Sequence, residues 1–126
     1  MDLLLDTHVF LWWDAASAEL SAACRAAIAD PSNRIFVSAA SVWEIDIKRR
    51  TGKLAFSGSA VEAIRQNGFL EAPILGRDAE AAAALDWSHA DPVDRLLVAQ
   101  AQLGSLTLAT ADKVIRGFGD VTQLKA

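Results

Sequence analysis

Cysteine, histidine and long apolar runs are scarce in this sequence, and each scarcity excludes a class of protein. The single cysteine, Cys24, can form no disulfide within the chain, and it rules out a cysteine-based zinc site. The two histidines, His8 and His89, lack zinc-ligand spacing. No apolar run reaches the roughly 18 residues that a membrane-spanning helix needs, and the first residues lack the basic region of a signal peptide. We therefore expect a cytoplasmic protein without a membrane partner.

Basic residues are also in deficit, because 12 Lys and Arg face 16 Asp and Glu, for a formal net charge of −4. At face value this balance argues against a nucleic-acid-binding protein, whose usual footprint is basic. Apolar residues make up 52% of the chain, which excludes disorder. A chain of 126 residues is the usual size of one domain, so we expect a single domain over residues 1–126.

Short apolar segments alternate with helical patterns along the chain. Strands are expected at residues 2–6, 35–37, 71–75, 106–109 and 121–124. Helices are expected at residues 8–14, 17–29, 39–50, 59–67, 77–87, 91–103 and 111–118. This alternation predicts an α/β fold, a three-layer α/β/α sandwich around a four- to five-stranded parallel sheet. Ligands of such sheets bind at the carboxyl ends of the strands.

Residue preferences at helix ends predict several boundaries. Ser17 is the expected N-cap of the second helix, and Gly104 is the expected C-cap of the helix over 91–103. Asp91 before Pro92 is a strong N-cap signal. Glu44 has two interpretations: it forms a capping box with Ser41, or it lies inside a helix that begins earlier, at Ser38.

Four acidic residues lie just after the expected strands or early in the helices that follow: Asp6, Glu44, Asp94 and Asp112. Each also has a purely structural interpretation, because Asp6 can simply enter solvent and the others suit the first turn of a helix. A parallel sheet, however, brings these positions to one edge. Clustered carboxylates repel unless they hold protons or bind a cation, and oxygen ligands suit Mg²⁺ or Mn²⁺. The combination predicts a divalent-metal site.

The order and spacing of four blocks resemble the PIN-domain ribonucleases, specifically a VapC-type toxin of a type II toxin–antitoxin system. The blocks are Leu4-Leu5-Asp6-Thr7-His8, Ser41-Val42-Trp43-Glu44-Ile45, Asp91-Pro92-Val93-Asp94-Arg95 and Leu108-Ala109-Thr110-Ala111-Asp112. The resemblance implies that Asp6 and Asp94 are the main metal ligands and that Glu44 and Asp112 complete the site. It also implies supporting roles for Thr7, Thr110 and Asp91, the last as a helix cap. Arg95 either contacts RNA or orients a neighbouring carboxylate.

The same resemblance implies a reaction and partners. The expected reaction is Mg²⁺- or Mn²⁺-dependent hydrolysis of RNA phosphodiester bonds by an endoribonuclease. The expected partners are an RNA substrate, a VapB-type antitoxin and a second copy of the chain in a homodimer. The basic residues expected to contact RNA are Lys48, Arg49, Arg50, Lys53, Lys113 and Arg116. His8 is either structural or substrate-facing. Asp46 departs from the pattern of related toxins, and it either pairs with Arg50 or adds negative charge near the cleft.

Two other functions fit parts of the sequence. A receiver-type signalling domain has this size and an acidic pocket, but it needs an acid at the tip of the third strand, where Gly76 stands. A catalytically inactive PIN-like protein that only binds a partner is the second alternative.

The large apolar side chains Phe10, Trp12, Trp13 and Trp43 either pack in the core or form a partner surface. The four candidate acids together carry a charge of −4, which equals the net charge of the chain. The acid surplus therefore no longer argues against an RNA-binding protein.

Overall fold

The computed structural model describes residues 1–126 and contains five strands and seven helices. All strands pair in parallel in one sheet, in the order β3-β2-β1-β4-β5. The strands are β1 (Asp2–Leu5), β2 (Arg34–Ser38), β3 (Leu70–Ala72), β4 (Thr107–Thr110) and β5 (Gln123–Lys125). The α/β class and the five-stranded parallel sheet predicted from the sequence are confirmed.

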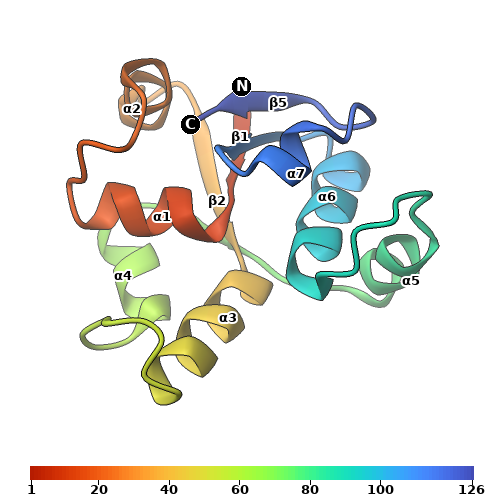
Figure 1. Cartoon of the computed structure of the whole chain (residues 1–126). Helices are drawn as coiled ribbons and strands as arrows, with labels where there is room; N and C mark the ends of the chain where they lie inside the picture. The colour runs from red at the N-terminus through yellow and green to blue at the C-terminus, as the bar shows by residue number, and fades with distance from the viewer.

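The helices cover both faces of this sheet (Figure 1). They are α1 (Thr7–Asp14), α2 (Ala22–Ala29), α3 (Ala39–Arg50), α4 (Ala60–Gln66), α5 (Gly76–Ala84), α6 (Pro92–Gly104) and α7 (Lys113–Arg116). Alternate residues of β1 point to opposite faces, so Leu3 and Leu5 pack in the core with α1, α2 and α4. Leu4 packs in a second core with α6 and α7. The three-layer arrangement follows from this alternation, because each face of a buried strand needs an apolar cover.

The boundaries of α3 and α4 agree with the sequence, whereas α2 begins later than expected. Ser21, not Ser17, caps α2 by accepting a hydrogen bond from the amide of Cys24 at 3.1 Å. The amide of Ser21 donates to the carbonyl of Ala126 at 2.7 Å, and its hydroxyl donates to the carbonyl of Lys125. The C-terminal end of the chain therefore selects the cap, which a local pattern does not reveal.

Several other elements differ from expectation: α5 ends at Ala84 and not at Trp87, and β5 begins at Gln123 and not at Val121. Helix α6 includes Gly104 and ends at Ser105, which adopts the left-handed conformation with φ of 53°. A Cβ at Gly104 would meet the Leu106 side chain at 3.3 Å, so this glycine provides space and not a cap conformation. Helix α7 is a single turn, shorter than the expected 111–118. Strand β3 ends at Ala72, before Pro73, which has no amide hydrogen to donate to a neighbouring strand.

Strand direction determines which ends of the helices meet. Leu5 is in register with Val37 of β2 and Ala109 of β4, so the residues after these strands lie along one edge, the carboxyl edge. Helix α6 leads into β4 and runs back across the sheet, so its N-terminus also lies at this edge. None of the seven helices has the length and apolar composition required to cross a bilayer.

Candidate metal centre

Asp6 lies at the carboxyl end of the central strand and is only 5% exposed. It caps α1, because its Oδ1 accepts a hydrogen bond from the amide of Val9 at 3.0 Å. Its Oδ2 accepts a short hydrogen bond from the hydroxyl of Thr110. Burial raises the pKa of Asp6, and the hydrogen bonds from Thr110 and Val9 only partly oppose this effect. The carboxylate is therefore held rigidly in a place where its charge is costly.

Thr110 connects Asp6 to Asp112 at the end of β4. The Thr110 side chain is fully buried, and its hydroxyl oxygen accepts a hydrogen bond from the Asp112 amide at 3.0 Å. Asp112 caps α7 by accepting hydrogen bonds from the amides of Val114 and Ile115 at 2.8 and 3.2 Å. Both of these bonds use Oδ1, which leaves Oδ2 open to another ligand.

Asp94 enters the same edge from the first turn of α6. Asp91 is the N-cap of this helix, as expected, and accepts a hydrogen bond from the Asp94 amide at 2.9 Å. The Oδ2 of Asp94 lies 2.7 Å from Nε2 of His89. Burial, together with the charges of Asp91 and Asp112, raises the pKa of Asp94 to about 6 in spite of the His89 hydrogen bond.

The charge of Asp112 links the other two carboxylates. It raises the pKa of Asp6 and also that of Asp94, so all three groups share one electrostatic environment. A divalent cation would relieve this repulsion, because it favours the charged form of every carboxylate near it.

Glu44, the fourth candidate acid, has a partner within its own helix. Ser38 caps α3, so Glu44 is inside the helix and the capping-box interpretation with Ser41 is wrong. Glu44 forms an ion pair with Lys48 at 3.2 Å. Ser41, one turn before Glu44, accepts a hydrogen bond from the Thr7 hydroxyl at 2.9 Å, so this face of α3 contacts the start of α1.

The four acids suit a divalent ion by their chemistry, although no three of the Asp, Glu, His and Cys side chains converge to hold one ion as they stand. Each acid instead has a protein partner. Thr110 binds Asp6, His89 binds Asp94 and Lys48 binds Glu44. The oxygen-only donor set is the type that Mg²⁺ and Mn²⁺ prefer. An ion at this edge would therefore replace these partners or draw the carboxylates together.

Arg95 and His89 differ most from expectation. Arg95 contacts no carboxylate directly, because all of its hydrogen bonds go to backbone carbonyls. Zinc-ligand spacing does not identify His89, because its partner is a carboxylate and not a second metal-binding side chain. The signal that could have identified it is its place two residues before the Asp91 cap, within reach of the first turn of α6.

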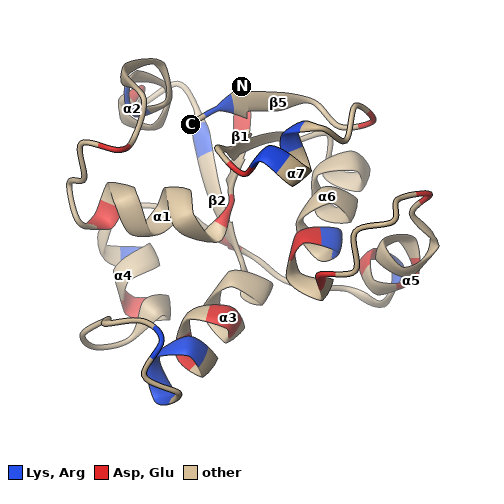
Figure 2. Ribbon diagram, viewed as in Figure 1, with Lys and Arg blue, Asp and Glu red and all other residues tan.

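All three basic residues of α3 are already paired. Lys48 binds Glu44, while Arg49 and Arg50 both bind Asp46, which confirms the expected pairing with Arg50. Arg49 also donates to the Gly58 carbonyl at 2.6 Å. Figure 2 shows the basic residues of α3 at its C-terminal end, away from the sheet, and those of α7 directly beside the acidic edge. Lys53 is exposed beyond the end of α3.

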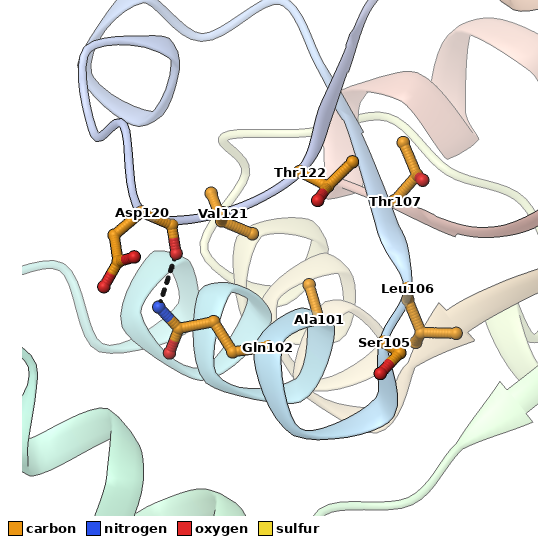
Figure 3. Close-up of a pocket in the computed structure, with 8 residues that line it drawn as sticks. All are labelled: Ala101, Gln102, Ser105, Leu106, Thr107, Asp120, Val121 and Thr122. Atoms are coloured by element: carbon orange, nitrogen blue, oxygen red, sulfur yellow. Dashed lines mark hydrogen bonds between the residues drawn. The ribbon is translucent and has the colours of Figure 1, made fainter.

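A hollow of about 570 Å³ lies elsewhere, between the C-terminal end of α6, the start of β4 and the loop before β5 (Figure 3). Across it, Nε2 of Gln102 donates to the Asp120 carbonyl at 2.7 Å (Figure 3). The hollow is at the amino edge of the sheet, and Asp120 is the only charged residue that lines it. It offers no set of ligands for a cation.

Comparisons with known proteins identify the family and the fold of this chain. The profile of the PIN domain matches residues 3–121. No curated protein matches the sequence. The fold is similar to a chain of VapBC2 from Rickettsia felis, crystallised with a promoter DNA fragment, at 12% identity and a TM-score of 0.68, covering 99% of this chain and 98% of that one.

Two further structures have the same fold. One is a toxin–antitoxin complex from Klebsiella pneumoniae, at 22% identity and a TM-score of 0.65, covering 93% of this chain and 92% of that one. The other is FitAcB from Neisseria gonorrhoeae, at 21% identity and a TM-score of 0.60, covering 97% and 96%. The family match spans nearly the whole chain and includes all four candidate acids, and we conclude that this protein belongs to the PIN domain family.

Proposed function

We propose that this chain is a metal-dependent endoribonuclease that acts as the toxin of a toxin–antitoxin pair. The observation that carries the proposal is the shared environment of Asp6, Asp94 and Asp112, in which burial and, to a smaller extent, the charge of Asp112 raise the pKa of both Asp6 and Asp94. Holding charged groups together in this way costs stability, and a bound cation offsets that cost. Membership of the PIN family agrees with a nuclease site at this edge.

In this proposal Asp6 and Asp94 hold a Mg²⁺ or Mn²⁺ ion, and Asp112 and Glu44 complete the site. When bound, the ion supplies Lewis-acid activation of water and neutralises charge on the phosphodiester. Thr110 keeps Asp6 in place through its hydrogen bond, and His89 does the same for Asp94. Glu44 becomes available when Lys48 moves from it to a substrate phosphate.

The substrate proposed is RNA bound across α7. Lys113 and Arg116 are exposed on this helix and form no ion pair within the chain. Lys113 directly follows Asp112, so a phosphate bound to it would lie close to the acidic edge. Arg49 and Lys53 would contact RNA farther from the cleaved bond, because an α-helix rises about 1.5 Å per residue and α3 leads away from the sheet.

The direct test is cleavage of RNA by the purified chain with Mg²⁺ or Mn²⁺, and with EDTA. We expect cleavage with either metal and none with the chelator, and end-mapping of the products would then identify the RNA sequence that is cut. An absence of both cleavage and Mn²⁺ binding by calorimetry would favour the inactive, partner-binding alternative. That alternative has one observation in its favour, since no three ligands converge as they stand.

The receiver-type alternative is not supported by the topology. Receiver-like folds order their strands 2-1-3-4-5. Here the order is β3-β2-β1-β4-β5, and β3 is followed by Pro73 with no acid at its tip.

The proposed inhibitor is an antitoxin segment in a groove beside the acidic edge. The groove, of about 490 Å³, lies between α1 and residues 54–57, and its apolar lining includes Leu11, Trp12 and Phe56. Asp14 and Glu19 also line it, which suits a basic segment. His8, also in the lining, is two residues from Asp6, so a bound segment would reach the site.

We expect a cognate antitoxin, added in equimolar amount, to reduce cleavage about tenfold or more, because its segment would block access to Asp6. Leu54→Glu in the groove should weaken this inhibition. Leu103→Glu, at a side chain 45% exposed near the C-terminal end of α6, is the matched control and should leave it unchanged. Undiminished cleavage by the complex would contradict the proposal.

The homodimer stays a prediction from the resemblance. Phe10 is fully buried, and Trp12 and Trp13 pack against the core, so these aromatic side chains are mainly structural. Trp43 is 55% exposed and Ile47 is 41% exposed one turn later on α3. They are the exposed apolar side chains of α3 available to a second copy.

A further inference from the structure

We infer that Arg95 is a positioning residue that holds residues 85–91 in the conformation that places His89 on Asp94. The inference rests on the proposed function, because it assigns Arg95 a part in shaping the metal site. Every hydrogen bond that the Arg95 side chain donates goes to a backbone carbonyl, and none goes to a carboxylate.

The guanidinium of Arg95 uses its full capacity of five N–H donors on five carbonyls. Its Nε donates to Ala82 at 2.9 Å, and its Nη2 donates to Ala83 at 3.3 Å and Leu85 at 2.9 Å. Its Nη1 donates to Trp87 at 2.7 Å and His89 at 2.9 Å. One side chain therefore organises the end of α5 and the segment that follows it.

This part of the chain has few other means of holding its shape. Helix α5 has no basic residue in its last turn, and no glycine follows it to reverse the backbone. Residues 85–91 form no helix or strand, and their one internal backbone hydrogen bond runs from the Trp87 amide to the Leu85 carbonyl. The carbonyls left over at the end of a helix need partners, and here Arg95 supplies them from a different helix.

The segment held by Arg95 ends at the metal centre. Arg95 binds the backbone carbonyl of His89, while the imidazole of the same residue binds Oδ2 of Asp94 at 2.7 Å. The His89 ring also packs against Trp87, with ring centroids 4.8 Å apart, and Trp87 packs against Phe118 at 4.7 Å. Two successive residues of α6 thus hold His89: Arg95 binds its backbone carbonyl and Asp94 binds its ring. These two contacts fix the direction of the Asp94 carboxylate.

Lysine cannot replace arginine in this role, because an ammonium has three donors and lacks the planar fork. Arg95→Lys is therefore the informative variant. Arg77→Lys, at an exposed arginine of α5 with no hydrogen bond in the chain, is its matched control. Thermal unfolding would first establish that both variants fold.

The first readout needs no metal and stands apart from the proposed function. We expect hydrogen exchange at the Trp87 amide, which donates to the Leu85 carbonyl, to become about tenfold faster or more in Arg95→Lys, and to stay unchanged in Arg77→Lys and in His89→Ala. His89→Ala keeps the backbone carbonyls that Arg95 binds, so it should not loosen the segment. Unchanged exchange in Arg95→Lys would overturn the inference.

The second readout is Mn²⁺ affinity measured by calorimetry. Loss of a residue that orients a metal ligand typically weakens binding about 10–100-fold, and we expect this loss in Arg95→Lys and also in His89→Ala. The double variant should lose little more than either single one, because both act on Asp94 along one path. Fully additive losses would overturn the positioning role. Absence of Mn²⁺ binding in the unaltered protein would instead contradict the proposed function, and hydrogen exchange would still decide whether Arg95 holds the segment.

Discussion

Asp6→Asn is expected to reduce RNA cleavage about 10²–10³-fold or more, because it removes the carboxylate at the centre of the proposed metal site. Asparagine has nearly the same shape and is as good an N-cap as aspartate, so α1 should persist. Its one side-chain oxygen keeps the hydrogen bond from the Val9 amide, and its Nδ2 takes the place of Oδ2 beside Thr110, whose hydroxyl oxygen can accept from it. The variant therefore changes charge with little change in structure.

Cleavage of a labelled RNA under single-turnover conditions measures this effect, and Mn²⁺ calorimetry should show a parallel loss of affinity. Asp94→Asn should behave in the same way. The matched control is Asp120→Asn, which removes the same charge at an exposed position beside the hollow of the amino edge. Full activity of Asp6→Asn, or activity that survives EDTA in the unaltered protein, would contradict a metal centre at this edge.

The second large effect concerns stability, since Asp94→Asn is expected to stabilise the metal-free protein at pH 7. The pKa of Asp94 is raised from 3.8 to about 6 in the folded state, chiefly by burial. Between pH 4 and 6 the folded chain therefore holds a proton that the unfolded chain has lost, and stability falls as the pH rises through this window. Above about pH 6 the charged Asp94 carboxylate lowers the free energy of unfolding by up to about 3 kcal/mol. Asparagine avoids this cost, and we expect a gain of about 1–2 kcal/mol.

Urea unfolding in EDTA at several pH values tests this result. The difference in free energy of unfolding between the variant and the unaltered protein should be smallest near pH 4 and should grow until about pH 6 to 7. Saturating Mn²⁺ should reverse the order, because only the unaltered protein gains stability from the ion. Asp86→Asn, at an exposed aspartate in the segment before α6, is the control for loss of one charge. A variant less stable at pH 7, or a difference independent of pH, would contradict the raised pKa.

Local sequence patterns were sufficient for the fold and for the positions of the candidate acids. The leucine run before Asp6 predicted the central strand, and the pattern of residues 39–50 predicted α3 with both ends correct. Asp91-Pro92 predicted the start of α6, and with it the place of Asp94 in the first turn. These predictions succeed because a buried strand, a helix face and a cap each depend on residues a few positions apart.

Side-chain partners across the fold were decided only by the tertiary structure. Nothing near Arg95 in the sequence indicates that it binds five carbonyls, and nothing near Ser21 indicates that the C-terminal strand holds it. The pairing of His89 with Asp94 likewise depends on the path of residues 85–91, which Arg95 maintains. Such partners come from segments that meet when the layers pack, and the free energy that selects them belongs to the packed chain and not to any local run of residues. The sequence by itself therefore located the acidic edge, whereas packing determined which side chains hold its carboxylates in place.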